Sequence, residues 1–298
     1  MTDPMRVVVS GASGLIGTAL CASLRRDGHT VTPLVRRAAR PGESHWDPAA
    51  GHVDRSVLEG ADAVVHLAGA GIGDARWTAA YKREILESRT RSTGVLACAI
   101  AGASRRPRVF VSASAIGWYG ARGDERLAES AAPGTGFLAE VCARWEDAAQ
   151  GAGVRTVLLR TGIVLSAHGG ALAKQLPLFR LGLGGRFGSG RQWQSWIDLD
   201  DEVRAIRHAI DSRLEGPVNL TAPEPATGAD FARTLARVLR RPALLPIPAF
   251  GPRLLLGREL ADALLFTGQR VMPDALVASG FDFSYPTLEA SLRHLLDR

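Results

Sequence analysis

The sequence predicts an α/β protein with a doubly wound parallel sheet and a smaller C-terminal lobe. Two observations lead to this prediction. Over the first 165 residues, short apolar runs alternate with longer helical patterns, and a glycine-rich turn follows the first apolar run. Such alternation is the form that βαβ units take in a sequence. The pattern changes after residue 165, so we divide the chain into residues 1–165 and 166–298.

Five apolar runs in the first part are expected to be strands. They are RVVVS (6–10), TVTPLVR (30–36), AVVHLAG (63–69), RVFVSAS (108–114) and RTVLLRT (155–161). Helical patterns separate them, at residues 15–27, 77–101 and 136–150. Because parallel strands need such crossover helices, the order favours one parallel sheet.

The second part is expected to return one segment to the sheet and to form the smaller, substrate-binding lobe. It starts with a glycine-rich, loop-like stretch around one helical turn. A helix in EVRAIRHAI, a strand in GPVNLTA and a helix in TGADFARTLARVL follow, and Asp201 is expected to cap the first of these. Residues of about 245–292 are expected to form a C-terminal domain, with a terminal amphipathic helix from about residue 286.

Composition and charge favour a globular protein of the cytoplasm. The net charge is +6, but Lys and Arg are scattered singly or in pairs, so we expect no nucleic-acid partner. No apolar run approaches the roughly 18 residues of a membrane span, so we expect no membrane partner. The cysteines Cys21, Cys98 and Cys142 are odd in number and far apart, which favours small core residues over disulfides or a metal site.

The glycine-rich turn after the first strand predicts a nucleotide-binding loop. Gly11, Gly14 and Gly17 give G-x-x-G-x-x-G at a strand-to-helix junction. Glycine permits a tight turn, close approach of N–H groups to a pyrophosphate and close packing of helix on strand, as in Rossmann-like folds. The helix start adds the positive end of its dipole. We expect the cofactor to contact Gly11, Ser13, Gly14, Leu15, Ile16 and Gly17.

The residues after the second strand decide which dinucleotide is expected. NAD-binding proteins carry an acidic residue about 20 residues after the loop, whereas an arginine there accommodates a 2′-phosphate. This chain has Arg36 and Arg37 in that region and no acid. We therefore expect NADP(H) as the cofactor. The alternative is a solvated basic loop that contacts no ligand.

Several motifs taken together resemble the extended short-chain dehydrogenase/reductases, the epimerase-like superfamily. They are SGASGLIG, HLAGAGIG, FVSASAIGWYG, LLRTGIVLS and SWIDLDD, in the expected order. Further stretches are similar to the subfamily called "epimerase family protein": RWTAAYKREILESRTRST, GFLAEVCARWE, LPLFRLGLGGRFGSGRQWQSWI and LLFTGQRVMPDALVASGFDFSYPTL. These proteins are atypical members with a C-terminal domain of unknown function. The resemblance covers almost the whole chain and implies a monomer or a homodimer.

The resemblance also implies further cofactor contacts. Leu67 and Ala68, in HLAG, would pass beside the adenosine and the diphosphate. The helix containing KREILESR would offer Glu84 and Arg89, and Val164 would lie near the nicotinamide. For Glu84 and Arg89, an exposed helix face is the alternative.

The acid–base pair of the superfamily is absent. A standard member uses a tyrosine followed four residues later by a lysine, whose charge lowers the pKa of the tyrosine. The chain contains only two lysines, and Tyr81, Tyr119 and Tyr285 are followed at this spacing by Ile85, Gly123 and Glu289. The matching positions look like Phe137 and Val141, neither of which moves a proton.

Two side chains remain as catalytic candidates. Ser114, at the end of FVSAS, matches the strand-end serine of the superfamily, although a serine there can equally be a hydrogen-bonded structural residue. Tyr119 is the best remaining phenol, but the sequence names no cation beside it, so its pKa is expected to stay near 10. His66 is interpreted as a buried strand histidine rather than a catalyst.

Polar groups of the second part are candidates for binding a substrate. The glycines of RLGLGGRFGSGRQ would let a loop approach a ligand closely, and arginines suit an anionic one. The candidates are Lys174, Arg180, Arg191 and Trp196. The alternative is a flexible surface loop with solvated charges.

Two hypotheses about function follow. The first is an NADP(H)-dependent oxidoreductase or epimerase that acts on a small oxygenated substrate, for which an anionic group would suit the arginines, without the usual tyrosine and lysine. The second is a non-catalytic NADP(H)-binding sensor or scaffold. The absent acid–base pair favours the second, and the polar loop flanked by Trp193 and Trp196 favours the first.

Overall fold

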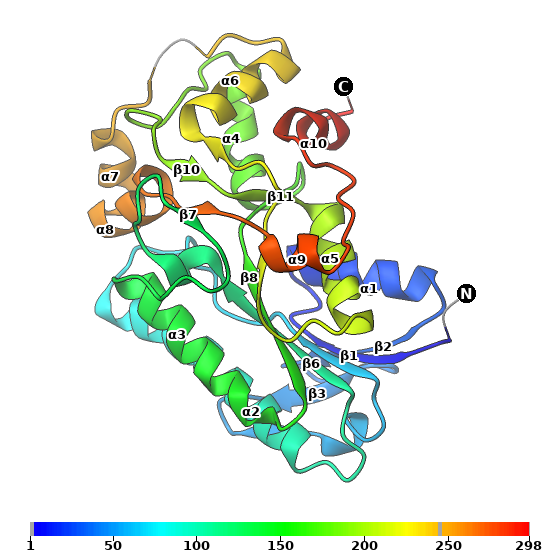
Figure 1. The fold of residues 1–298 in the computed structure, drawn as a ribbon. Helices are drawn as coiled ribbons and strands as arrows, with labels where there is room; N and C mark the ends of the chain where they lie inside the picture. Colours follow the sequence, from blue (N-terminus) through cyan, green and yellow to red (C-terminus); the bar gives the residue numbers. More distant parts are fainter. Residues whose placement is uncertain (1–2, 244–245, 298) are drawn as a thin grey trace.

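The computed structural model describes residues 3–243 and 246–297, which form two lobes (Figure 1). The larger lobe contains an eight-stranded sheet in the order β12-β8-β6-β5-β1-β2-β3-β4. All neighbouring strands are parallel except β3 and β4. The chain starts at β1 near the centre and winds outward in both directions, which confirms the predicted architecture.

The strands of this sheet are short and mostly apolar because helices cover both faces. They are β1 (Arg6–Ser10), β2 (Thr30–Val35), β3 (Ser44–Asp47), β4 (His52–Val53), β5 (Ala63–His66), β6 (Val109–Ala115), β8 (Arg155–Thr161) and β12 (Gly216–Leu220). The five strands predicted for the first part are confirmed, and β12 is the segment expected to return to the sheet. The hairpin of β3 and β4 was not predicted.

The helices of the larger lobe form a layer on each face of the sheet. Figure 1 shows α1 (Leu15–Arg26) and α5 (Leu199–Asp211) on one side, and α2 (Ala79–Ala101) and α3 (Phe137–Ala149) on the other. Each side buries its own apolar cluster between sheet and helices. Three-residue and four-residue 3₁₀ turns lie at Arg55–Val57, Ile116–Tyr119 and Gln150–Ala152. The three predicted helices are confirmed with ends shifted by at most two residues.

The smaller lobe packs three longer helices around the buried side chains of Trp196, Phe231 and Leu292. These helices are α4 (Gly170–Arg180), α6 (Gly228–Leu239) and α10 (Leu288–Leu295). Shorter elements are α7 (Phe250–Leu256), α8 (Arg258–Ala261), a π-helical turn (Asp262–Phe266) and α9 (Asp274–Ala278). Three strand pairs complete the lobe: β9 (Ile163–Leu165) with β11 (Trp196–Asp198), β10 (Trp193–Gln194) with β13 (Ala226–Thr227), and β7 (Arg126–Leu127) with β14 (Arg270–Val271).

Several details of the second part differ from the prediction. Helix α4 has three turns rather than the single turn expected, and α10 starts at Leu288 rather than about residue 286. Asp198, not Asp201, caps α5, because its carboxylate accepts the N–H of Asp200 at 2.9 Å. The boundary expected near Leu245 falls outside the described residues.

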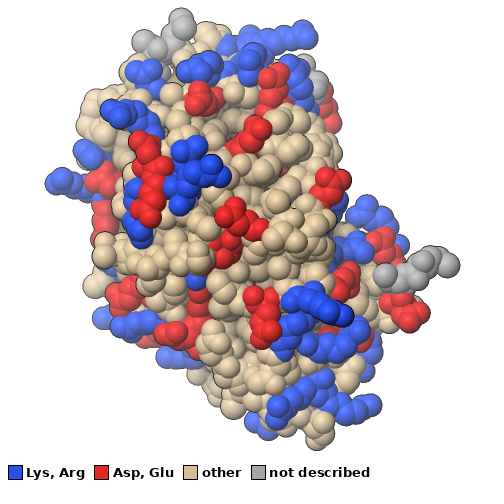
Figure 2. Space-filling model, viewed as in Figure 1, with Lys and Arg blue, Asp and Glu red and all other residues tan. Residues whose placement is uncertain are grey.

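Charged side chains are spread over the surface rather than gathered by sign. Figure 2 shows Lys and Arg interspersed with Asp and Glu over both lobes on the face it presents. Among the described residues, no helix combines the length and the apolar content that crossing a membrane requires.

A buried ion pair joins the sheet to α3. Arg160 on β8, which is 3% exposed, donates to both carboxylate oxygens of Glu146 on α3, each at 2.9 Å. Ser114 on β6 donates its hydroxyl to Oε1 of the same carboxylate at 2.6 Å. The guanidinium also lies 4.0 Å from the ring centroid of Trp118. Three separate elements therefore share one buried charge pair.

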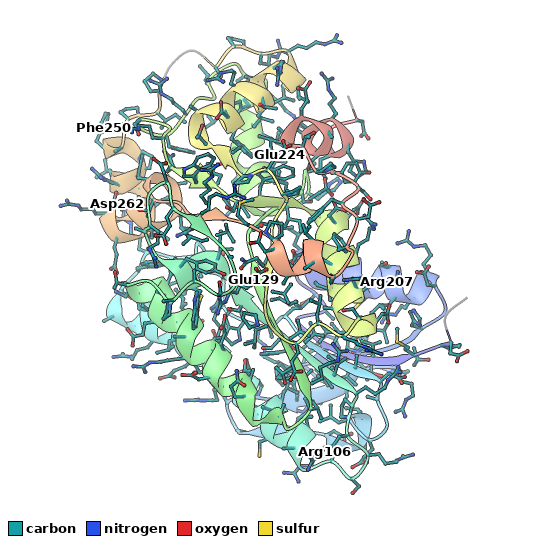
Figure 3. The ribbon with its side chains drawn as sticks, in the orientation of Figure 1. Arg106, Glu129, Arg207, Glu224, Phe250 and Asp262 are labelled. Carbon is teal, nitrogen blue, oxygen red and sulfur yellow. The ribbon has the colours of Figure 1, made fainter. Side chains whose placement is uncertain are left out.

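The same network reaches the second lobe through Tyr119. Nη1 of Arg160 donates to the hydroxyl oxygen of Tyr119 at 3.1 Å, and that hydroxyl donates to Oδ1 of Asn219 on β12 at 2.6 Å. Asn219 donates its side-chain amide to the carbonyl of Met272. Glu129, near the centre of Figure 3, adds a carboxylate that accepts the N–H groups of Asn219 and Ala275. The network thus connects the sheet with the segment that leads into α9.

A second buried polar link joins β1, β5 and α2. The imidazole of His66 bonds to the hydroxyl of Ser10 at 2.5 Å through Nδ1 and to that of Ser92 at 3.0 Å through Nε2. Burial, assisted by the charge of Arg89, lowers the pKa of His66 to about 3. The imidazole is therefore neutral near pH 7, where it can donate one hydrogen bond and accept the other.

Breaking the Arg160–Glu146 pair from one side is expected to destabilise the fold strongly. Arg160→Met leaves a buried carboxylate without its counter-charge, which costs about 3–5 kcal/mol of unfolding free energy. The double variant Arg160→Met/Glu146→Leu should lose less than the sum of the two single changes. Urea unfolding of the wild type, Arg160→Met, Glu146→Leu and the double variant measures these free energies. The control is Arg91→Met, which removes the exposed ion pair between Arg91 and Glu87. Additive losses would contradict the coupling.

Acid is expected to destabilise the protein through His66. In the unfolded chain this histidine takes up a proton below its ordinary pKa of about 6.5, whereas the folded protein does not until about pH 3. The protonation of His66 in the unfolded chain should therefore remove about 2 kcal/mol of stability as the pH drops from 7 to 5. When unfolding is measured at pH 7, 6 and 5, the change in stability with falling pH should be less favourable in the wild type and in His45→Gln than in His66→Gln, by about this amount. Equal slopes would refute the assignment.

Candidate functional site

The glycine turn after β1 forms a cradle that only glycine fits. Gly11 has φ +71°, and a Cβ there would lie 2.7 Å from the carbonyl carbon of Leu67. A Cβ on Gly17 would overlap the backbone of Gly11. The N–H of Gly14 donates to the carbonyl of Gly11 at 3.0 Å and closes the turn. Gly11 and Gly17 therefore let β1, the loop after β5 and α1 meet without side chains between them.

The start of α1 presents N–H groups without acceptors from their own helix. Gly14 is the N-cap and has no side chain to bond them, and Leu15 and Ile16 are the first two helical residues. Their N–H groups lie in the first turn, where the helix supplies no carbonyl. Ser13 and Gly14 are exposed, so a ligand can reach this place. The arrangement suits an anion such as a pyrophosphate.

A second helix begins beside the first. Gly169 caps α4, and a Cβ there would lie 3.1 Å from Cδ1 of Leu15. A Cβ on Gly170 would lie 3.4 Å from the carbonyl oxygen of Val164 and 3.6 Å from Leu15. Like α1, α4 has no side-chain cap. The positive ends of two helices and the backbone of Val164 thus lie around the same space.

The two arginines after β2 have different partners. Arg37 donates to both carboxylate oxygens of Glu43 at 2.7 Å, and this hydrogen bonding lowers the pKa of Glu43 to about 2. Arg36 is exposed and forms no ion pair with any described residue. Arg37 therefore orders the turn after β2, while the guanidinium of Arg36 remains available to a ligand.

One face of α2 holds the loop that follows β5. Ser88 accepts the N–H of Ala70 at 3.1 Å, and Tyr81 donates its hydroxyl to the carbonyl of Gly71 at 2.6 Å. This loop starts with Leu67 and Ala68, and the N–H of Leu67 donates to the carbonyl of Ser10 beside the glycine turn. The loop and the cradle are therefore one continuous surface at the carboxyl ends of β1 and β5.

Arg89 is a half-buried cation without an acidic partner among the described residues. Its guanidinium lies 5.0 Å from the ring centroid of Trp145 and packs against Gly69. It donates to the carbonyl of Ile85 on its own helix. Burial lowers the pKa of Arg89, which shows that the site solvates its charge poorly. Glu84, on the same helix, is exposed. The guanidinium of Arg89 therefore suits an anionic or hydroxyl-rich ligand, whereas the exposed position of Glu84 fits a solvated helix face.

Ser114 and Tyr119 both belong to the buried network of Arg160 and Glu146. Ser114 is 4% exposed and Tyr119 is fully buried, and each hydroxyl is already bonded within the protein. Burial raises the pKa of Tyr119, although Arg160 opposes the rise. No cation was predicted beside Tyr119 from the sequence. In the structure, Arg160, which is 41 residues further along the chain, donates to its hydroxyl. Both side chains therefore connect secondary-structure elements.

The positions of the usual acid–base pair carry no ionisable group. Phe137 packs against Trp77, and the ammonium of Lys82 lies 4.6 Å from the centroid of the Phe137 ring. Lys82 pairs with Glu259 of α8 at 2.6 Å. Val141 is buried. The cation beside the start of α3 is thus Lys82 of α2, and its ion pair is with the second lobe.

The four candidates of the second lobe do not converge. Trp196 is fully buried and donates its indole N–H to the carbonyl of Glu224. Arg180 lines a hollow of about 260 Å³ with Leu239, Arg241 and Leu296. Lys174 and Arg191 are exposed, on α4 and on the loop before β10. The structure therefore brings no two of the four together.

Residues 250–272 lie across the loop that follows β5. Arg76 of that loop donates to the carbonyls of Leu254 and Leu255 at the end of α7. On the other side, Gln192 donates to the carbonyl of Leu265, and Ser195 to that of Gln269. Figure 3 shows Phe250 and Asp262, which mark this segment, at the edge of the second lobe. The polar side chains of the loop before β11 are thus partly bonded to the C-terminal segment.

Asp198, Asp200 and His294 place ligand-type atoms within 4.8 Å of one another. Each already has a partner in the protein. Asp198 accepts from Ser291, and His294 bonds to Asp200 at 3.0 Å. The group therefore connects α5 with α10.

Sequence reasoning missed several buried ionisable residues, among them Glu146, Arg160 and Glu202. Arg160 interrupts the apolar run of β8, and the other two lie at buried positions of amphipathic helices. A charged residue at a position where the periodicity calls for an apolar one is the signal that would have identified them.

Known proteins resemble this chain over its whole length. "Epimerase family protein Mb2239" of Mycobacterium bovis is 46% identical over 98% of both chains. The crystal structure of the human epimerase family protein SDR39U1 with NADPH is 35% identical, with a TM-score of 0.91 over 99% of this chain and all of that one. A nucleoside-diphosphate sugar epimerase from Corynebacterium glutamicum is 38% identical with a TM-score of 0.80, and the match spans 58% of that chain.

Family comparisons cover nearly the whole chain. The domain of unknown function DUF1731 matches residues 247–295, which include α7 to α10. The family described as "NAD dependent epimerase/dehydratase" matches residues 7–220, from β1 to β12. This match covers the whole sheet and the glycine cradle, and the chain belongs to the NAD dependent epimerase/dehydratase family.

Proposed function

We propose that this chain binds NADP(H) and acts as an oxidoreductase or epimerase on a small oxygenated substrate in the cytoplasm. The observation that carries the proposal is the cradle of Gly11, Gly14 and Gly17, in which added Cβ atoms at Gly11 and Gly17 would collide with the backbone. Such a cradle fits the pyrophosphate of a dinucleotide. The human relative whose structure contains NADPH supports the same cofactor.

Different residues around the cradle would bind different parts of the dinucleotide. The N–H groups of Leu15 and Ile16 would hold the pyrophosphate, with the start of α4 adding a second positive helix end. Arg36, which has no acidic partner among the described residues, would bind the 2′-phosphate. Arg89 and Val164 would lie toward the other end of the cofactor.

For the proposed reaction, the protein would need to orient the substrate more than to supply acid–base groups. A nicotinamide cofactor supplies or accepts the hydride itself. Arg89, a poorly solvated cation, would stabilise negative charge on a substrate oxygen. The segment 250–272 would keep water away from the loop after β5. Ser114 and Tyr119 would preserve the geometry of the site rather than move protons, since their hydroxyls are bonded internally.

A sensor or scaffold that binds NADP(H) without turnover is the second candidate. The burial of both candidate hydroxyls favours it, because Ser114 and Tyr119 already bond to groups within the protein. The two candidates share the cofactor and differ in whether a substrate is converted.

Arg36 is expected to select the 2′-phosphate. Titration of nicotinamide fluorescence should show tighter binding of NADPH than of NADH. Loss of a charge-assisted contact in Arg36→Ala should weaken NADPH binding about 10- to 100-fold and leave NADH binding unchanged. Arg37→Ala is the matched control. It should change affinity less, because Arg37 is committed to Glu43. Failure to bind NADPH would refute the proposal, and equal effects of both variants would refute the role of Arg36.

Turnover should separate the two candidate functions. We expect at least one compound in a panel of aldehydes, ketones, quinones and sugars to oxidise NADPH above the background rate, followed by absorbance at the nicotinamide band. Ser114→Ala and Tyr119→Phe should retain this rate within about threefold when folded, whereas loss of a working acid–base group costs about 10²–10⁴-fold. NADPH binding with no turnover on the whole panel would favour the sensor.

A further inference from the structure

Glu202 is a fully buried acid with one unsatisfied oxygen. It lies in the first turn of α5 and has no exposed surface. Oε1 accepts a hydrogen bond from the hydroxyl of Thr161 at 3.0 Å, and Oε2 has no partner among the described residues. Burying a polar atom without a partner costs free energy. A side chain that carries this cost, at a position where an apolar residue would fit, calls for a functional explanation.

The hydrogen bond to Thr161 locates Glu202 at the carboxyl edge of the sheet. Thr161 is the last residue of β8 and pairs in register with Ala115, the last residue of β6. Both residues are partly exposed. In a doubly wound sheet, a dinucleotide crosses this edge where the strand order reverses. Here that point is β1, with β2 on one side and β5, β6 and β8 on the other.

The nicotinamide half would therefore lie on the side of Glu202. The 2′-phosphate partner, Arg36, follows β2 on one side of β1, so the other half of the cofactor extends toward β6 and β8. Val164, three residues after Thr161, packs on the same apolar cluster as Ile16 of α1. Leu199, at the start of α5, packs on that cluster too. The start of α5, the start of α1 and β9 thus pack on the same face of the sheet, and Glu202 is linked to the carboxyl edge of that sheet through Thr161.

Within the part of the chain that the structure describes, the surroundings of Glu202 offer no counter-charge. The facing elements β6 and β9 carry no ionisable side chain, and on β11 Asp198 is bonded to Ser291. Cys21 is the buried ionisable group of α1, and Arg160 on β8 is paired with Glu146. On α5 itself, Asp201 accepts two N–H groups from residues 284 and 285. Burial raises the pKa of Glu202 to about 8, although the bond from Thr161 opposes this. The carboxyl is therefore largely neutral at pH 7.

We propose that Glu202 lets the protein distinguish NADP⁺ from NADPH, by releasing its proton when the positively charged nicotinamide ring is bound. The inference rests on the proposed function and adds a determinant of redox-state selectivity to it. With NADPH, the ring is neutral and the carboxyl keeps its proton. With NADP⁺, the proton on the unpartnered Oε2 leaves to solvent, the Thr161 hydroxyl continues to donate to Oε1, and the negative charge of the carboxylate attracts the positive ring. One proton is released and no bond of the cofactor changes.

The direction of the effect follows from elementary electrostatics. A positive charge nearby favours the ionised carboxylate, and the apolar surroundings strengthen the attraction. Binding linked to proton release becomes tighter as the pH rises, by up to tenfold per pH unit for one proton. The affinity for NADP⁺ should therefore increase with pH in the range just below 8. The affinity for NADPH should not follow it, and both cofactors carry the same phosphates, whose own titration cancels in the comparison.

The test is isothermal titration calorimetry of the full chain with NADP⁺ and with NADPH at pH 7. Each titration is repeated in phosphate and in Tris, whose ionisation enthalpies differ. The buffer dependence of the heat gives the number of protons released. We expect NADP⁺ to release between half and one proton more than NADPH. We also expect the ratio of the two dissociation constants to shift toward NADP⁺ between pH 6.5 and 8.

Variants assign the proton to Glu202. Glu202→Gln keeps the size of the side chain and should abolish both the extra proton and the pH dependence of the ratio. The exposed Glu87→Gln on α2 is the matched control and should retain them. Thr161→Val keeps the carboxyl, removes its hydrogen bond, and should shift the pH dependence to higher pH without abolishing it.

Each result decides a different point. If both cofactors bind and release equal numbers of protons, the inference is wrong while the proposed function stands. If Glu202→Gln still shows the extra proton, the group responsible is another one and the inference is equally wrong. If neither cofactor binds to the wild-type protein, the proposed function itself fails.

Discussion

The ion pair between Arg160 and Glu146 is the constraint on which the arrangement of the two lobes depends. A buried charge is tolerated only when its counter-charge and its hydrogen bonds are all in place. Arg160 therefore fixes α3 against β8, orients Ser114 on β6, and reaches Asn219 on β12 through Tyr119. Since Asn219 holds the carbonyl of Met272, the position of the C-terminal segment follows from the same charge pair.

This network changes how the site should be understood. The hydroxyls of the two catalytic candidates, Ser114 and Tyr119, both bond to the buried Arg160–Glu146 pair, so both help to hold the fold together. In the proposed function, the groups that would act on a ligand are the backbone N–H groups at two helix starts, the guanidinium groups of Arg36 and Arg89, and the acid Glu202. Such a set is well suited to binding and to electrostatic stabilisation, and it contains no obvious proton shuttle of the usual kind. By the further inference, the buried acid Glu202 would be the group whose protonation changes with the charge of the nicotinamide ring.

Much of the larger lobe follows from local sequence, and the rest depends on long-range contacts. The glycine turn, the five strands and the first three helices were predictable because apolar periodicity and glycine spacing report on neighbouring residues. The β3–β4 hairpin was not, since strands of four and two residues give too short a pattern. Helix α4 starts at two glycines and contains Pro177, so local propensity argued against it, and packing of Leu172, Leu176 and Phe179 on the lobe core outweighs that. The partner of Tyr119 lies 41 residues away, and no spacing rule connects the two.

The contacts of residues 250–272 with the loop after β5 have a consequence for the order in which the parts of the protein form. A chain leaves the ribosome from its N-terminus, and domains fold as units during synthesis. The sheet is complete once β12 has emerged, whereas the segment that contacts Arg76, Gln192 and Ser195 comes later. The loop after β5 thus stays uncovered on a nascent chain that already contains the full cradle. The segment from α7 onward can therefore cover this loop only after the cradle has formed.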